Sequence, residues 1–455
     1  MKNLRSFTLL LLAFSLTFCQ AQNIKRKILF GTYTVDITDS IADVLKLDNN
    51  KGTLIQKVVP QTTADNLKLT QNDVILKINN IEIENSQGFV SLIKSYREGE
   101  KVVVDYVRNG EHKRAEGIAL AKPKETSEDY EVIYDEAKFN DGYIRIIINK
   151  PHGIAKAPAI VFIPGYMCYS LDNIGKHPYG QLIDGLTKKG YVLIRVEKLG
   201  EGDCLNTPNC IDVDFETELA GFEAGIRSLN KYDFIDQENI FIWGHSLGAI
   251  EATFLAERTE VKGIIVNGTT AYSWFEYLIA MSRFQEPLLG ADYVEIDEEM
   301  QDYIKFQYEF LVLKKTPLEL SKNEAYTKIM EEQQFDGKDK IFMRNYRYWQ
   351  QLEDAEKAKA LKNSNAYVLS IWNSFDLEAF SEQDHKAIID MVNYYHPGKG
   401  TYIKLENTTH SFTKVESMQQ GVENHSNYSF IYENFNPEIT EITHKWIQSV
   451  LQKKL

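Results

Sequence analysis

The residues with the clearest capacity for chemistry surround Ser246. The glycine-flanked run Gly244–Gly248 lies between an apolar, strand-like run, Asn239–Trp243, and a helix-like stretch, Ala249–Ala256. A serine on such a strand-to-helix turn is strained and exposed, and the glycines remove side chains that would clash there. The first N–H groups of the helix carry partial positive charge, so the Leu247 N–H can stabilise an oxyanion. The run therefore predicts that Ser246 is a nucleophile for acyl transfer.

An acid and a base for this serine are expected further along the chain, each after a strand. The strand-like run Ala366–Trp372 leads to Asp376, which would orient the base and offset its charge. The run Tyr402–Leu405 leads to His410, which would accept the serine proton. The weaker alternatives are the nearby carboxylates Glu378 and Asp384, and the histidines His385, expected on a helix, and His425, in a polar loop.

Strands and helices alternate from about residue 129 to residue 455, which is typical of an α/β domain with a mainly parallel sheet. The order serine, acid, histidine on this framework resembles the α/β-hydrolase superfamily. The run Arg195–Asp203 is similar to a bacterial group of exported serine hydrolases, whose members carry Pro at Leu199 and Ser at Cys204. The resemblance implies esterase, thioesterase or peptidase activity with no metal or other cofactor. The two departures put the chemistry of that loop in doubt.

The resemblance also implies a second oxyanion donor in the loop after the third strand, residues 163–168. The backbone N–H of Tyr166 or of Met167 would provide it. Many members of the superfamily carry His-Gly at this point, whereas here Pro164 precedes Gly165. The choice between the two donors therefore stays open.

A helical insertion, residues 271–363, is rich in aromatic and charged residues and is expected to cap the site. A large apolar cap suits acyl chains, so a carboxylic ester is the first substrate class that we expect. The apolar side chains of its first helix could line the pocket or form the core of the cap: Trp274, Phe275, Tyr277, Leu278, Met281 and Phe284.

Residues 28–123 alternate short β-branched runs with turns and include one helix-like stretch, Ser86–Tyr96, which predicts a small α+β domain. Three segments of it resemble the PDZ family: Gly52–Pro60, Ala64–Leu67 and Asp73–Asn79.

In this resemblance the loop that receives the C-terminal carboxylate of a peptide falls at residues 29–32. Backbone N–H groups of Phe30, Gly31 and Thr32 would point at the oxyanion, and glycine permits the tight turn. The peptide would then add as a strand, and delivery of chain ends makes peptide amides the second substrate class. Three side chains of the helix could wall the pocket or belong to the core: Phe89, Leu92 and Ile93.

Residues 1–21 are typical of an export signal, because two basic residues precede the apolar stretch Phe7–Phe18 and Ala21 ends a small-residue cleavage site. The stretch is shorter than the roughly 20 residues that span a bilayer, so we expect no transmembrane segment in the mature chain. Lipid attachment at Cys19 is the alternative to a free periplasmic or secreted protein.

The remaining features limit the size, partners and redox state of the mature chain. The full chain of 455 residues favours two domains, and its net charge of −14 disfavours a nucleic-acid partner. Cys168, Cys204 and Cys210 could form one disulfide with one free thiol or stay reduced. A binding protein with a PDZ-like domain and an inert hydrolase domain is the alternative from another class.

Overall fold

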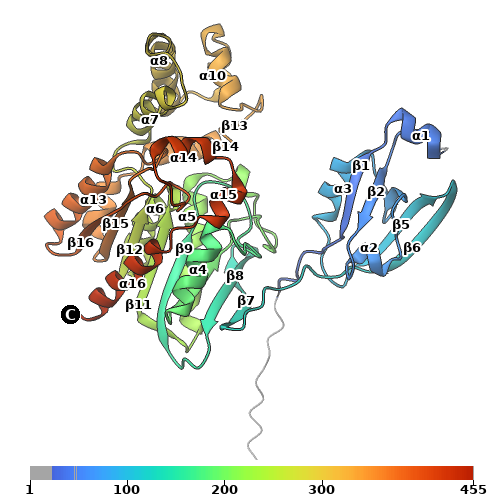
Figure 1. Ribbon diagram of the computed structural model, residues 1–455, viewed down its shortest axis with the longest axis horizontal. Helices are drawn as coiled ribbons and strands as arrows, with labels where there is room; N and C mark the ends of the chain where they lie inside the picture. Colours follow the sequence, from blue (N-terminus) through green and yellow to red (C-terminus); the bar gives the residue numbers. More distant parts are fainter. Residues whose placement is uncertain (1–22, 46, 48, 454–455) are drawn as a thin grey trace, which may run out of the picture.

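The computed structural model describes residues 23–45, 47 and 49–453, which form a small N-terminal domain and a larger second domain (Figure 1). The signal peptide predicted for residues 1–21 lies outside the described residues. Among the helices that are described, none combines the length and apolarity needed to cross a bilayer.

The small domain is an antiparallel sheet with helices packed against it. Its strand order is β1-β2-β3-β5-β6, with β4 paired to β3. The core contains Phe30 and Phe89, whose rings meet edge to face at 5.1 Å. The elements are β1 (Thr32–Asp36), α1 (Asp39–Leu45), β2 (Thr53–Val58), α2 (Thr63–Asn66), β3 (Val74–Ile78), β4 (Ile81–Glu82), α3 (Ser86–Ile93), β5 (Lys101–Arg108) and β6 (Glu111–Ile118).

The large domain is built on an eight-stranded sheet with the order β16-β15-β12-β11-β9-β10-β8-β7. Strand β8 is antiparallel to both of its neighbours, and the other adjacent pairs are parallel. This is the order of the α/β-hydrolase fold, so the predicted fold class is confirmed. The strands are β7 (Tyr130–Phe139), β8 (Gly142–Pro151), β9 (Ala157–Ile163), β10 (Val192–Val196), β11 (Ile235–His245), β12 (Gly263–Asn267), β15 (Tyr367–Asn373) and β16 (Gly400–Leu405).

Helices cover both faces of this sheet, because its parallel strands are apolar on both sides (Figure 1). One face packs against α4 (Pro178–Lys188) and α16 (Glu438–Leu451). The other packs against α5 (Phe215–Arg227), α6 (Leu247–Thr259) and α13 (Glu382–Tyr395). Short elements follow the strands at the end that carries the site: η1 (Cys210–Asp212), α14 (Met418–Asn424) and α15 (Tyr428–Glu433). The short helix η2 (Ser228–Lys231) lies between α5 and the start of β11.

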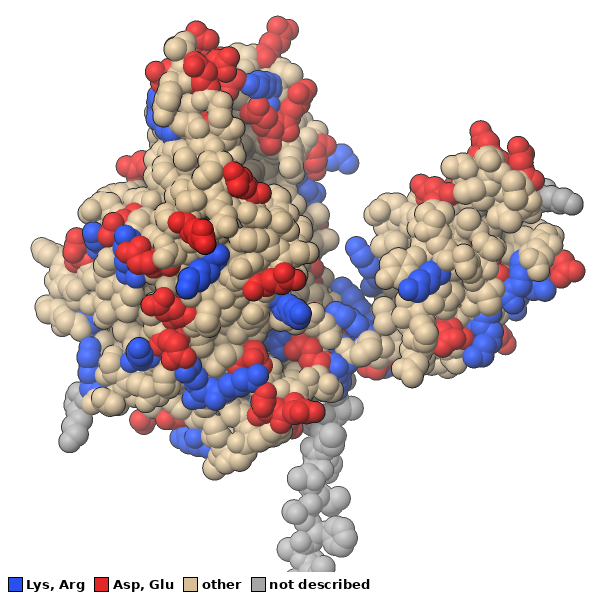
Figure 2. Space-filling model, in the orientation of Figure 1, with Lys and Arg blue, Asp and Glu red and all other residues tan. Residues whose placement is uncertain are grey.

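Most of the insertion between β12 and β15 stands above the sheet (Figure 1). Its elements are α7 (Trp274–Leu288), α8 (Tyr293–Gln307), η3 (Tyr308–Val312), α9 (Pro317–Leu320), η4 (Glu324–Tyr326), α10 (Thr327–Glu332), β13 (Lys340–Ile341), β14 (Arg344–Asn345), α11 (Tyr346–Glu353) and α12 (Lys357–Asn363). Helix α12 packs against α6 and α13 and so lies in the layer that covers the sheet. Acidic side chains gather at the tip of this cap, over α8 (Figure 2).

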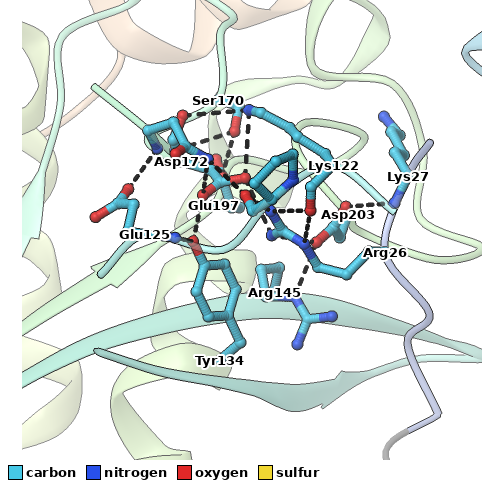
Figure 3. A network of polar contacts seen from close by, with 12 residues as sticks. Arg26, Lys27, Lys122, Glu125, Tyr134, Arg145, Ser170, Asp172, Glu197 and Asp203 are labelled. Atoms are coloured by element: carbon cyan, nitrogen blue, oxygen red, sulfur yellow. Dashed lines mark hydrogen bonds and ion pairs between the residues drawn. The ribbon is translucent and has the colours of Figure 1, made fainter. Parts of the chain in front are cut away.

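The two segments that join the domains run side by side and are fixed by a buried polar network (Figure 3). The Lys122 N–H donates to the Lys27 carbonyl oxygen at 2.9 Å. Arg26, which is 2% exposed, lies 3.0 Å from Asp172 and 2.9 Å from Asp203 of the large domain, and it also donates to the Lys122 carbonyl. Both ends of the small domain are therefore anchored at one place.

Candidate active site

Ser246 lies on a sharp turn between β11 and α6, with φ 56° and ψ −128°. The flanking glycines are required by close backbone contacts. A Cβ on Gly244 would lie 2.3 Å from the Gly248 carbonyl oxygen, and one on Gly248 would lie 2.4 Å from the carbonyl oxygens of Ile163 and Pro164. Strain of this kind persists where the surroundings enforce it, and it concentrates at functional sites.

Asp376 and His410, predicted as acid and base, are in direct contact. His410 Nδ1 lies 2.9 Å from Oδ2 and 3.0 Å from Oδ1 of Asp376. The Asp376 carboxylate also accepts the N–H groups of Glu378 and Ala379, and the residue is only 1% exposed. These contacts fix the proton of His410 on Nδ1 and leave Nε2 free to accept a proton.

The end of β12 brings this pair to the serine. The Ser246 N–H donates to the Asn267 carbonyl oxygen at 2.9 Å, and a Cβ on the next residue, Gly268, would lie 2.8 Å from Cε1 of His410. Gly268 has φ +64°, which also favours glycine. Sequence reasoning missed this residue, and its only local signal is a glycine directly after a buried strand.

Glu378 supplies a second negative charge near the base. Its carboxylate lies 4.0 Å from His410 Nδ1 and 3.5 Å from His425 Nε2. Burial lowers the pKa of His410, but Asp376 and Glu378 together raise it to about 9. The hydrogen bond with Glu378 raises the pKa of His425 as well. A cavity of about 20 Å³, lined in part by Glu378, His410 and His425, lies beside the base.

The remaining alternatives have structural contacts. Asp384 accepts hydrogen bonds from the Thr270 hydroxyl at 2.6 Å and from the Ala271 N–H. His385 lies on α13, donates from Nδ1 to the Ser381 carbonyl and accepts the Thr269 N–H on Nε2. Burial lowers the pKa of His385, which keeps its ring neutral. Neither residue contacts His410 through a hydrogen bond within the described chain.

His245 lies between Gly244 and Ser246 and holds the backbone of His410 in place. Its Nε2 lies 3.0 Å from the His410 carbonyl oxygen, and its Nδ1 lies 2.6 Å from the Tyr179 hydroxyl. Because a carbonyl only accepts, the proton is on Nε2 and Tyr179 donates to Nδ1. Burial lowers the pKa of His245 well below its usual range, so this neutral tautomer persists. Sequence analysis gave no role to His245 or Tyr179.

The loop after β9 lies against the serine, and we call residues 164–168 the oxyanion loop. A Cβ on Gly165 would be 3.2 Å from the Ser246 Cβ. The loop is tied to its surroundings by a disulfide, Cys168–Cys210. The sequence had left the cysteine pairing open, and the structure pairs these two and leaves Cys204 as a buried thiol, whose pKa burial raises to about 12.

A row of aromatic rings from the cap runs from this loop to the backbone at Glu378, two residues after Asp376. The Tyr166 ring stacks on the Phe342 ring, with 5.4 Å between ring centroids, and is tilted against the Trp349 ring at a centroid distance of 5.9 Å. Trp274 stacks on Trp349 and on Tyr277, whose hydroxyl donates to the Glu378 carbonyl. Of the other cap side chains singled out, Leu278 is buried, Phe275 and Met281 are half-buried in the same core, and Phe284 stacks on Phe380.

The loop at residues 29–32 has a regular arrangement of its peptide groups. The carbonyls of Leu29, Phe30 and Gly31 accept hydrogen bonds from the N–H groups of Thr63, Ala64 and Val59, at 3.1, 2.9 and 2.8 Å. Because C=O and N–H point in opposite directions in a trans peptide, the N–H groups of Phe30, Gly31 and Thr32 face the other way.

Gly31 has φ +81°, and a Cβ there would lie 2.2 Å from Thr62 Oγ1. Of the predicted wall residues, Phe89 is 1% exposed and belongs to the core, while Leu92 and Ile93 are half-buried against it.

Two clusters in the described chain have ligand atoms close enough to share a cation: Cys168, Glu201 and Cys210, and Asp376, Glu378 and His410. In the first, the two sulfurs are bonded to each other and are not thiolates. In the second, the Asp376 carboxylate is already hydrogen-bonded to Nδ1 of His410. These donor atoms therefore have other uses.

Comparison with known proteins identifies the small domain. Residues 39–117 match the family model of the PDZ domain. Over 95 residues the chain is 26% identical to "Probable periplasmic serine endoprotease DegP-like" of Marinomonas sp. (strain MWYL1), a match that covers 21% of this chain. It covers 20% of that protein, so the chain spans about a fifth of the length of this relative. The loop at residues 29–32 lies outside the family match.

Several solved structures are similar to about seven tenths of the chain. Est1E from Butyrivibrio proteoclasticus is 13% identical, with a TM-score of 0.43 over 71% of this chain and 99% of that one. An esterase from Pyrobaculum calidifontis is 13% identical, with a TM-score of 0.45 over 71% and 87%. The esterase domain of a Rhodothermus marinus protein is 14% identical, with a TM-score of 0.41 over 70% and 98%. The protein thus joins a PDZ domain to a domain whose own strand order is that of an α/β hydrolase.

Proposed function

We propose that this chain is an exported serine hydrolase that cleaves carboxylic esters through an acyl-enzyme on Ser246. The observation that carries the proposal is the convergence of three strand ends. The strained serine follows β11, Gly268 after β12 contacts the ring of His410, and Asp376 after β15 holds that ring.

In this mechanism His410 Nε2 takes the proton of Ser246 Oγ while the oxygen attacks the ester carbonyl. The carbonyl oxygen becomes an oxyanion and accepts the Leu247 N–H, one of the first N–H groups of α6, which have no intrahelical acceptor. The ester C–O bond then breaks, and His410 returns the proton to the departing alcohol. Water repeats the sequence on the acyl-enzyme and releases the acid and the free serine.

The aromatic row between Tyr166 and Tyr277 favours an ester with an apolar acyl group. Thioesters and amides are alternatives on the same triad. The N–H groups of residues 30–32 favour capture of a peptide C-terminus, so a peptide amide is the second candidate. The disulfide supports an oxidising compartment, periplasmic or extracellular, with a lipid anchor at Cys19 as the alternative.

The test is labelling of the mature chain with a fluorophosphonate probe, beside Ser246→Ala and, as a control serine on α16, Ser449→Ala. We expect labelling of the wild type and of the control only. Hydrolysis of esters, thioesters and amides with matched acyl groups then ranks the substrate classes. If the wild type fails to label under conditions where a known hydrolase labels, the alternative is favoured in which the chain is a binding protein with an inert large domain. Pull-downs of partner proteins with the wild type and with Gly31→Val would test that alternative.

A further inference from the structure

The peptide between Tyr166 and Met167 in the oxyanion loop is fixed by a side chain of the cap. Arg344 Nη1 donates to the Tyr166 carbonyl oxygen at 2.7 Å. Because the C=O and the N–H of a trans peptide point in opposite directions, the Met167 N–H is directed away from the guanidinium. Across the described chain this N–H meets no acceptor, and the Met167 side chain is 41% exposed. The Met167 N–H is therefore available to a bound ligand.

The charges around Arg344 leave its guanidinium free to bind this carbonyl. Arg344 is 1% exposed, and its Nη2 lies 2.6 Å from Glu218, which also pairs with Lys198 at 2.9 Å. A second acid, Glu251, is buried beside them, and burial followed by the charge of Glu218 raises its pKa well above the usual range. Two cations therefore share one carboxylate, and the remaining N–H groups of Arg344 can bind a neutral oxygen.

Arg344 is presented by a strained hairpin, β13–β14. The two residues of its turn, Phe342 and Met343, have φ 49° and 63°. Turns with two positive φ angles favour Asn and Gly, so bulky residues here are costly. The ring of Phe342 stacks on the Tyr166 ring at 5.4 Å. The hairpin therefore holds both the side chain and the carbonyl of Tyr166.

We propose that Arg344 is a positioning residue of the active site, which directs the Met167 N–H toward the oxyanion as its second donor. The proposal rests on the proposed function and resolves which residue of the loop donates. The disulfide at Cys168 fixes the loop on the other side of Met167. In this proposal the cap affects the rate of the chemical step through Arg344, and it affects substrate binding through its row of aromatic rings.

The experiment compares Arg344→Met and Arg344→Lys with the wild type in the full mature chain, by ester hydrolysis and by inhibition. Removal of one oxyanion donor typically costs about 10²-fold or more in kcat. We therefore expect a fall in kcat of about that size, with KM changed by less than about twofold. Binding of an alkyl boronic acid, which forms a tetrahedral adduct on the serine, should weaken in parallel, whereas binding of the carboxylate product should not.

Controls separate this role from folding. Arg347→Met removes an exposed arginine next to the hairpin, over the ring of Tyr346, and should leave kcat unchanged. Arg344→Lys keeps a cation beside Glu218 but lacks the planar fork, so it should fold and lose kcat even if Arg344→Met does not fold. Added guanidinium should partly restore Arg344→Ala. Folded variants with unchanged kcat, or with equal losses of boronate and product binding, would overturn the proposal.

A wild type that labels on Ser246 and hydrolyses esters establishes the proposed function independently of these variants. A wild type without either activity would refute that function and this inference together. Loss confined to kcat and boronate binding in the Arg344 variants supports the inference alone.

Discussion

Replacement of Glu378 by Gln should increase the proposed ester hydrolysis at neutral pH. The Glu378 carboxylate lies 4.0 Å from His410 Nδ1 and favours the charged imidazolium, which cannot act as a base. Two unit charges at this distance interact by about 1 kcal/mol in water and about 4 kcal/mol at an effective dielectric constant of 20. At 1.36 kcal/mol for each pKa unit, this corresponds to roughly 0.7 to 3 units.

Because the Glu378 side chain is 32% exposed, we expect the lower part of this range, about one unit. The pKa of His410 is raised to about 9 in the wild type and should fall to about 8 in the variant. The neutral fraction at pH 7, and with it kcat/KM, should then rise about tenfold, while the plateau at high pH stays the same.

The assay is the pH dependence of kcat/KM on one ester, from pH 6 to 10, with Glu382→Gln as a control that removes a surface carboxylate paired with Lys386. An unshifted profile, or one displaced to higher pH, would refute the electrostatic argument. Stability gives a second readout. The pKa of His410 is higher in the folded state, about 9, than in the unfolded state, about 6.5, so protonation of His410 stabilises the fold. This contribution is fully present below pH 6.5 and is lost as the pH rises through about 9. The destabilisation of Glu378→Gln should disappear over the same window.

Three further predictions concern the supports of the site. Gly268→Ala should displace the His410 ring and lower kcat about 10²-fold. Gly290→Ala, also at positive φ but with open space around its Cβ, should not lower kcat, and equal activities of the two variants would contradict the contact. The double variant Cys168→Ser, Cys210→Ser opens a loop with a sequence separation of 42, and its free energy of unfolding in urea should be lower by about 4 kcal/mol. A wild type whose stability does not change when reductant is added would argue against the disulfide. Arg26→Met removes the cation that balances the buried charges of Asp172 and Asp203 and should lower the free energy of unfolding by about 3–5 kcal/mol. The exposed control Arg283→Met should change it by almost nothing, and similar values for the two variants would refute the structural importance of Arg26.

The parts of the site that sequence could indicate are those that follow a strand directly. Ser246, Asp376 and His410 each come shortly after an apolar run, and the carboxyl ends of parallel strands meet at one edge of a sheet. The order of serine, acid and histidine along the chain was implied by the resemblance, and the three predicted runs that lead to them correspond to β11, β15 and β16.

Other parts carried no local signal. Strand β7 was not predicted, because its charged residues, such as Glu131 and Asp135, interrupt the apolar alternation at the edge of the sheet. Arg344 lies 178 residues from the carbonyl that it binds, and Tyr179 lies 66 residues from His245. Such contacts depend on the packing of the cap and of α4 against the sheet, which periodicity and spacing do not encode. The second oxyanion donor stayed undecided for the same reason.

The adjacency of Lys27 and Lys122 has a consequence for chain design. Ile28 and Ala121 form a bridge pair, so the chain enters and leaves the PDZ domain at neighbouring points beside the large domain. A chain in which a short turn replaces residues 28–121 would keep the ion pairs of Arg26 with Asp172 and Asp203 and would lose its backbone contacts with Glu98. Exposed sites with adjacent ends are those where domains are gained and lost most readily. The PDZ domain is in this sense an interchangeable module, and its contribution to catalysis can be measured by deletion in one polypeptide.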